Sequence, residues 1–494
     1  MSEIENIQDD ITTRNIVVNS NESNGTKVPL KRVLGLTSAI LLVAGNVIGT
    51  GIFKKIVPMA ASGLSEKYIL AAWILAGIIT MLGAFSIAGL AKLTTEAGGM
   101  FEYLRLCYGD FISFLFGWSR FTIVGSGAIA AVAFIFAQSF NSFIHFPDLL
   151  YQWQHVSVGS VYPFADSGVK TLAIIVIVLL TWFNYRGIKN TAVLNNVVTG
   201  AKIFGILLLI VLGVFFSHSS EVVNTNSFNM NNAGWLSFAG IFFGVMLNAF
   251  WAYDGFANVS AVSGEIKNPK KNLPVAIITG VSIVLILYTL INYAFMHSMS
   301  LNQLASIGGG KVAAIVVAEN IIGKAGTVMI SLLVLLSTFG FLNAAILVNS
   351  RFNFRMAQAN LFFKNASRVH PVYQTPHIAL LYFMIGSCVL VVSGSFDVLT
   401  DMVVFASFSF YVLLAIGLIK MKRKGVIREK ITGYPFAPIV FSLFIVIVLV
   451  STFINNPSRS ITGIALVLTG VPFYYFFKRK NKKVSEQHKL ETTK

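Results

Sequence analysis

The fold is decided by the stretch Leu34–Phe53, which reads LGLTSAILLVAGNVIGTGIF. It is long and apolar enough to enter a bilayer, which takes about 20 such residues. Its middle carries Gly45, Gly49 and Gly51, and each glycine in a helix costs about 1 kcal/mol relative to alanine. We therefore predict a membrane helix that opens within residues 47–52. The Gly45-x-x-x-Gly49 spacing is also typical of a helix that packs closely on a neighbour, and this stretch alone does not separate the two interpretations.

An opened helix exposes peptide groups. In hydrocarbon, peptide groups without hydrogen-bond partners cost several kcal/mol each, so an open backbone at membrane depth persists only where protein or a polar cavity surrounds it. The first interpretation therefore predicts a polar chamber inside the protein.

The composition excludes a soluble enzyme with a single core. Of 494 residues, 55% are hydrophobic and only 12% are charged, too few polar residues to cover a water-exposed surface. Cys107 and Cys388 lie in separate predicted helices and form no disulfide framework. The seven histidines show no metal-ligand spacing, so we expect no metal, no cofactor and no enzymatic activity.

Twelve apolar runs have the length of a membrane span. They are Leu34–Pro58, Tyr68–Ala91, Phe111–Ala137, Val169–Tyr185, Asn195–Phe215, Leu236–Val262, Leu273–His297, Gly326–Phe354, His377–Ser393, Val398–Met421, Pro435–Phe453 and Ile461–Phe477.

The net charge of +17 predicts the topology. With the amino terminus in the cytoplasm, the cytoplasmic segments hold roughly four times as many Lys and Arg residues as the outer loops, which is the positive-inside bias. This bias predicts cytoplasmic termini for a multi-pass protein of the cell membrane. The excess of basic residues therefore belongs to the topology and does not indicate nucleic-acid binding, and the basic run at 478–489 is a candidate for attraction to anionic lipid headgroups. Residues 1–33 are expected to be a disordered cytoplasmic tail and residues 478–494 a basic one.

A second interrupted span contains Trp251–Asn258, WAYDGFAN. An ionisable residue such as Asp254 at that depth costs about 2.5 to 3.5 kcal/mol and by default marks a functional site. Because five crossings separate the starts of the two broken spans, they run in opposite directions, as in inverted-repeat transporters. We therefore predict an all-α integral membrane fold with five-helix repeats over 34–216 and 217–422, and helices eleven and twelve over 423–477.

Three sets of residues resemble the amino acid, polyamine and organocation (APC) transporter superfamily. Gly45–Phe53, GNVIGTGIF, resembles its first-helix signature. Trp251–Phe256 with Gly264–Pro274, GEIKNPKKNLP, is similar to the sixth helix and following loop of the L-type amino-acid transporter branch. Ser337–Asn343 with Ser350-Arg351 resembles its eighth helix. The resemblance covers about residues 31–477 and implies a LeuT-like 5+5 inverted repeat with broken first and sixth helices.

The resemblance also implies how a substrate amino acid binds. Its carboxylate would meet backbone amides of Thr50, Gly51 and Ile52. Its amino group would meet carbonyls of Val47 or Ile48 in the first helix, and of Trp251 and Asp254 in the sixth. The predicted substrate-binding set is Val47, Ile48, Gly49, Thr50, Gly51, Ile52, Trp251, Ala252, Asp254 and Gly255. Trp251 resembles the family's gate, with an indole packed between helices as the alternative.

Two ionisable residues are candidates for coupling. Lys202 resembles a tethered stand-in for the sodium ion of sodium-coupled relatives, which implies sodium-independent transport; the alternative is a lysine that snorkels to the inner interface. Asp254 stands where many L-type transporters have glycine, and it could bind the substrate amine, carry a proton or hydrogen-bond freed amides. Arg120 is expected to snorkel. Phe256 replaces a frequent tryptophan, which leaves side-chain selectivity open.

Three polar residues give smaller signals. Glu265 and Lys267 precede Asn268-Pro269 and either form part of an inner gate or simply end a helix. Asn343 is expected to pair with a neighbouring helix instead of lining the cavity.

The predicted function is sodium-independent exchange of small neutral L-amino acids by alternating access. The alternatives are a proton-coupled amino-acid importer and an antiporter of cationic amino acids or polyamines, for which Asp254 would be the counter-charge. The outer loop at about 141–166 has no cysteine, so it lacks the residue through which animal L-type transporters bind a glycoprotein partner. We therefore expect no disulfide-linked heavy chain.

Overall fold

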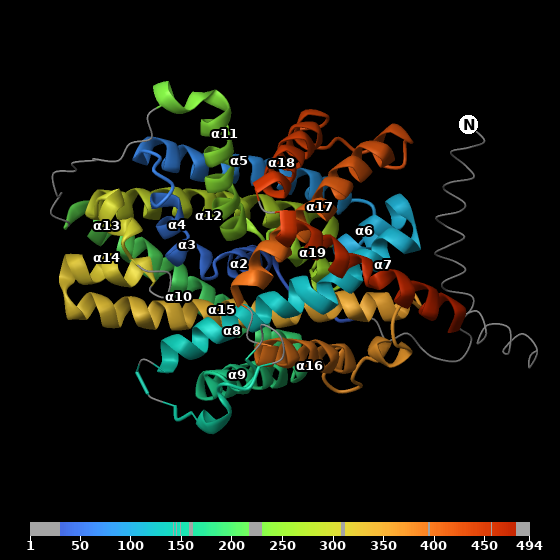
Figure 1. The fold of residues 1–494 in the computed structure, drawn as a ribbon. Helices are drawn as coiled ribbons and strands as arrows, with labels where there is room; N and C mark the ends of the chain where they lie inside the picture. Colours follow the sequence, from blue (N-terminus) through green and yellow to red (C-terminus); the bar gives the residue numbers. More distant parts are fainter. Residues whose placement is uncertain are drawn as a thin grey trace, which may run out of the picture.

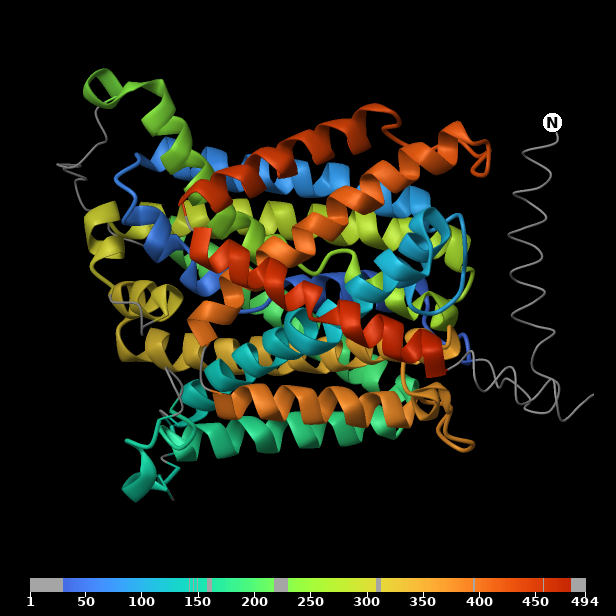
Figure 2. The same ribbon diagram turned by 45° about the vertical axis from the view of Figure 1, so that its right-hand side comes forward.

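The computed structural model describes residues 30–141, 143–144, 146–148, 150–157, 162–216, 230–307, 312–393, 396–455 and 457–480. These residues are almost entirely helical, and the only β-pairing among them is a single bridge between Leu34 and Ile266. Figures 1 and 2 show most of the long helices running in a similar direction, as one bundle. The prediction of an all-α membrane fold is confirmed. The predicted tails lie largely outside the described residues.

The helices follow one another with few long connections. In the first half of the chain they are α2 (Leu36–Val47), α3 (Gly51–Lys54), α4 (Ile56–Ala60), α5 (Glu66–Leu90), α6 (Gly99–Tyr108), α7 (Asp110–Ser119), the π-helix η1 (Arg120–Val124), α8 (Gly125–Asn141), η2 (Tyr151–Trp153), α9 (Ser167–Tyr185) and α10 (Ile188–Phe215). In the second half they are α11 (Met230–Tyr253), η3 (Asn258–Glu265), α12 (Pro269–Ser298), α13 (Leu301–Ala305), α14 (Ala313–Ile322), α15 (Lys324–Gln358), η4 (Lys364–Ser367), α16 (His377–Ser393), α17 (Phe396–Arg423), α18 (Phe436–Asn455) and α19 (Pro457–Leu468).

Helices occupy each of the twelve predicted ranges. Within the described residues, nine helices are long and apolar enough to cross a membrane. Two of the shorter apolar helices, α2 and α16, lie in the first and ninth predicted spans. The chain is therefore a multi-pass membrane protein, whereas twelve crossings and the boundaries of the repeats remain predictions.

The first broken helix is packed against α12, which also contacts α5. A Cβ atom on Gly280 of α12 would lie 2.6 Å from Cγ1 of Val43 in α2, so the two backbones approach closely. On the other side, the ring centroids of Trp73 in α5 and Tyr288 in α12 are 5.7 Å apart. This packing holds α2 in place at the point where its own backbone hydrogen bonds end.

The segment that leads into α2 is joined to the end of η3. The backbone amides of Val33 and Leu34 each donate to the carbonyl of Glu265 over 2.9 Å. The Glu265 carboxylate is fully buried and pairs with Arg351, with Nε–Oε1 and Nη2–Oε2 distances of 2.8 and 3.1 Å. Glu265 thus both ends η3 and forms a buried ion pair, whereas the side chain of Lys267 is exposed.

A second ion cluster surrounds Glu102 of α6, outside the spans. Arg355 Nε lies 3.0 Å from Glu102 Oε2, and Arg105 Nη2 lies 2.7 Å from Oε1. Burial alone would raise the pKa of Glu102, but the charges of Arg355 and Arg105 outweigh it and hold this pKa at about 2. The ionised carboxylate therefore ties α6 to the end of α15.

We expect Glu102 to make stability depend on pH. Its folded pKa of about 2 lies below the ordinary 4.5, so its contribution is complete above about pH 4.5 and is lost as the pH falls towards 2. A shift of this size corresponds to about 3 kcal/mol. Glu102→Gln should lower the melting temperature of the purified protein at pH 7, and the difference from wild type should shrink on acidification. Glu319→Gln, at an exposed position of α14, is the control; a Glu102→Gln difference that stays constant down to pH 2 would contradict the assignment.

Candidate functional site

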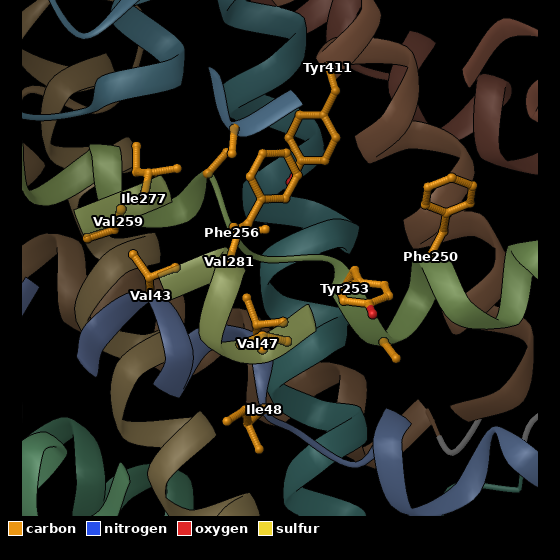
Figure 3. Packing of buried hydrophobic residues seen from close by; sticks show 14 of the residues in the cluster. Val43, Val47, Ile48, Phe250, Tyr253, Phe256, Val259, Ile277, Val281 and Tyr411 are labelled. Atoms are coloured by element: carbon orange, nitrogen blue, oxygen red, sulfur yellow. The ribbon is translucent and has the colours of Figure 1, made fainter. Parts of the chain in front are cut away.

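The first helix breaks within the predicted residues. Helix α2 ends at Val47, Ile48 has non-helical angles (φ −73°, ψ 86°), and α3 begins at Gly51. Figure 3 shows the blue ribbon unwinding at Val47 and Ile48. The close-packing interpretation holds as well, because a Cβ on Gly45 would lie 2.8 Å from the side-chain oxygens of Asn195 and Thr199 of α10.

The second break faces the first. Helix α11 ends at Tyr253 and η3 begins at Asn258, and Figure 3 shows the green ribbon thinning between Tyr253 and Phe256. Gly255 has a φ of +101°, and a Cβ there would lie 2.7 Å from the carbonyl oxygen of Asn46. Only glycine meets both the positive φ and the close approach. The prediction that the first and sixth helices are broken is confirmed.

Side chains from other helices satisfy the carbonyls at the first break. The hydroxyl of Tyr288 donates to the Val47 carbonyl over 3.0 Å. The Lys202 ammonium donates to the carbonyls of Gly45 and Ile48, over 3.1 and 2.8 Å, and Ser337 Oγ of α15 donates to Ile48 over 3.3 Å. Lys202 is fully buried, so the alternative of a snorkelling lysine is wrong. It joins α10 to the end of α2.

The amides on the other side of this break have no such partners. Within the part of the chain that the structure describes, the N–H groups of Thr50, Gly51 and Ile52 have no protein acceptor. The Val47 and Ile48 carbonyls, predicted to meet a substrate amine, already accept hydrogen bonds, whereas the amides of residues 50–52 and the Asn46 carbonyl have no hydrogen-bond partner among the described residues. At the second break the Trp251 carbonyl accepts, among the described residues, only a long 3.4 Å bond from the Asp254 amide.

A small cavity lies between the two breaks. Its volume is about 50 Å³, measured as the space open to the centre of a water molecule, which is room for a few waters. The lining residues are Asn46, Val47, Gly49, Thr50, Gly51, Arg120, Val124, Ala128, Val132, Trp251, Ala252, Asp254, Gly255, Asn258, Phe341, Ala345 and Asn349.

The structure brings together eight of the ten residues predicted to bind substrate. Ile48 and Ile52 are the exceptions, because their side chains are buried in the hydrophobic core. Lys202 lies behind the break, on the carbonyls of α2, and does not line the cavity.

Trp251 lines the cavity and is partly buried. Its ring packs with the apolar side chains of Ile123 and Val124 in η1. The Lys55 ammonium lies 5.6 Å from the ring centroid, as in a cation–π contact. The indole is thus both a wall of the cavity and a packed side chain, and its role as a gate remains a prediction.

Asp254 is held by Tyr411 of α17. The Tyr411 hydroxyl donates to Asp254 Oδ1 over 2.7 Å, and the carboxylate also interacts with the backbone of Gly255. Figure 3 shows the ring of Phe256 beside that of Tyr411, and their centroids are 5.3 Å apart. Of the three roles open to Asp254, support of the broken backbone agrees best with these contacts.

The prediction that Arg120 snorkels is wrong. Its side chain is 4% exposed and lines the cavity. Nε and Nη2 donate to Asn349 Oδ1 over 3.2 and 2.5 Å, and the guanidinium carbon lies 5.2 Å from the Phe352 ring centroid. These contacts with α15 hold the guanidinium inside the protein and away from the interface.

Sequence reasoning also missed other polar residues of the cavity. Asn46 and Asn258 each have a buried side-chain oxygen without a hydrogen-bond partner among the described residues. Such oxygens suit an ammonium group. Both asparagines lie within the two motifs quoted above, Gly45–Phe53 and Trp251–Asn258, so these motifs could have identified them. Asn343 pairs with Asn184 of α9 over 3.1 Å, so its predicted role in helix pairing is confirmed.

Two broken helices around a small cavity with polar and charged residues in its lining, within a bundle of apolar helices, are typical of a membrane transporter. Comparison with known families agrees: the family described as amino acid permease matches residues 34–477. The chain belongs to this family, and the predicted APC relationship is confirmed. Because this is a family of transporters, the prediction that the protein is not an enzyme is also confirmed.

Three relatives show the range of the family. The serine/threonine exchanger SteT of Bacillus subtilis (strain 168) is 31% identical over 93% of this chain and 99% of its own length. Asc-type amino acid transporter 1 of Mus musculus is 29% identical over 91% of this chain and 82% of its own. Large neutral amino acids transporter small subunit 2 of Homo sapiens is 28% identical over 92% and 82%.

We expect Gly51→Val to abolish transport. A Cβ on Gly51 would lie 2.9 Å from Cα of Ala252, so a side chain there forces the two breaks apart. The matched control is Gly200→Val on α10, because a Cβ at Gly200 meets nothing within 4 Å. Uptake of labelled amino acid by proteoliposomes should fall to background for the first variant and persist for the second. Transport at the wild-type rate by Gly51→Val would contradict the described contact.

Proposed function

We propose that this protein is a sodium-independent exchanger of small neutral L-amino acids in the cell membrane, with both termini in the cytoplasm and without a heavy chain. The observation that carries the proposal is the pair of opposed helix breaks around one small cavity. Free amides at Thr50 to Ile52 suit the substrate carboxylate, which gains from N–H donors at a helix start. Oxygens of Asn46, Asn258 and Trp251 suit its amino group.

The size and charge of the cavity support a small neutral side chain. The cavity is small, at about 50 Å³. The cavity lining contains one cationic and one anionic side chain, Arg120 and Asp254, so its formal charges cancel. The relatives named as a serine/threonine exchanger and an Asc-type transporter agree with this substrate class.

The position of Lys202 supports independence from sodium. Its ammonium lies 2.8 Å from the Ile48 carbonyl oxygen and 3.1 Å from the Gly45 carbonyl oxygen. A fixed cation therefore already binds these carbonyls at the end of α2. A dissolved cation is not needed there. Exchange follows if the empty carrier reorients slowly and the loaded one rapidly, because substrate supplies the partners that the free amides lack.

The experiment is uptake of labelled L-serine by proteoliposomes that contain only the purified chain. We expect uptake to be several-fold faster with unlabelled L-serine inside than without, and unchanged when choline replaces sodium. A collapsed proton gradient should leave the exchange rate unchanged. Uptake that does not depend on internal substrate but requires a proton gradient would support the proton-coupled alternative, for which Asp254 is the candidate, and would overturn exchange.

A further inference from the structure

Arg120 is placed in the cavity by a local irregularity of its helix. It is the first residue of the π-helix η1, which separates α7 from α8. A π-turn inserts an extra residue and rotates the side chains around it, and such turns occur frequently at functional sites. The hydroxyl of Ser126 donates to the Phe121 carbonyl over 2.5 Å, which satisfies one acceptor of the irregular turn.

The guanidinium of Arg120 keeps donors available in the cavity. A guanidinium has five N–H groups, and Asn349 Oδ1 is the acceptor for two of them. Asn349 is neutral, so this contact orients the guanidinium without cancelling its charge. Because the side chain is 4% exposed, that charge has little water around it.

Asp254 supplies the opposite charge from the other side of the cavity. It comes from the break between α11 and η3, and its orienting partner, Tyr411, is also neutral. Arg120 and Asp254 interact electrostatically, yet they form no ion pair within 4.0 Å among the described residues. The two charges therefore balance while each remains accessible from the cavity.

We propose that Arg120 and Asp254 set the charge selectivity of the pocket for the substrate side chain. With both present, a charged side chain would meet one attractive and one repulsive group, and its desolvation stays uncompensated. With one removed, the other becomes an unpaired buried charge that a substrate of opposite charge can satisfy. This inference rests on the proposed function and deepens it, because it assigns the preference for neutral substrates to two side chains.

The test is whether removal of either charge shifts the substrate preference towards amino acids whose side chain carries the sign of the charge removed. Asp254→Asn should raise the ratio of L-aspartate to L-serine uptake by about tenfold or more. Arg120→Gln should raise the ratio of L-2,4-diaminobutyrate to L-serine uptake by a similar factor. The double variant Arg120→Gln/Asp254→Asn should return both ratios towards wild type. A merely structural role for either residue would lower all rates together and leave the ratios unchanged.

Matched controls remove charges elsewhere. Lys189→Gln on α10 and Glu319→Gln on α14 change exposed side chains and should leave both ratios unchanged. Variants that transport slowly are tested by ligand-induced thermal stabilisation of the purified protein, where L-aspartate should stabilise Asp254→Asn but not wild type. If the wild type exchanges L-serine but the single variants keep the wild-type uptake ratios of charged to neutral substrate, this inference alone is overturned. Wild type that transports no amino acid would contradict the proposed function.

Discussion

Peptide groups freed at two helix breaks must be satisfied inside a protein whose outer surface faces lipid, and the rest of the structure follows from this constraint. At the first break, carbonyls are satisfied by Lys202, Tyr288 and Ser337, which come from α10, α12 and α15. Each of these hydrogen bonds joins a different helix to α2. The bundle is thereby organised around a helix that does not complete its own ladder.

Hydrogen bonding at the first break leaves some peptide groups without partners. The carbonyls of Gly45, Val47 and Ile48 accept hydrogen bonds from other helices, whereas the amides of residues 50–52 have no protein acceptor among the described residues. An unpaired buried donor costs about 1–3 kcal/mol, so a ligand carboxylate between the two breaks would remove a cost that the empty protein carries. In the proposed function such a site recognises the part that all amino acids share, and in the proposed charge selectivity Arg120 and Asp254 face the part that differs.

Much of the fold was predictable because it depends on local chemistry. Glycines at 45, 49 and 51 weaken a helix wherever it lies, and Asp254-Gly255 marks the second break for the same reason. Apolar length located the helices, although it does not decide how many of them cross the membrane. The positions of Thr50, Gly51, Trp251 and Asp254 at the cavity were predictable from the two breaks and from the family resemblance.

The errors lie where contacts are distant in sequence. Arg120 was expected to reach the interface, because nothing near it in the chain reveals the π-turn or the Asn349 acceptor 229 positions away. The Val47 and Ile48 carbonyls were expected to be open to substrate, because Tyr288 and Ser337 lie 241 and 289 positions from them. Periodicity and composition carry no information about such pairings.

The most direct measurement is an experimental structure of the full chain with L-serine bound. The account predicts the substrate between the breaks, with its carboxylate within hydrogen-bond distance of the amides of Thr50 and Gly51, and with Lys202 still on the Gly45 and Ile48 carbonyls. A continuous helix through residues 47–51, or L-serine bound away from both breaks, would contradict it.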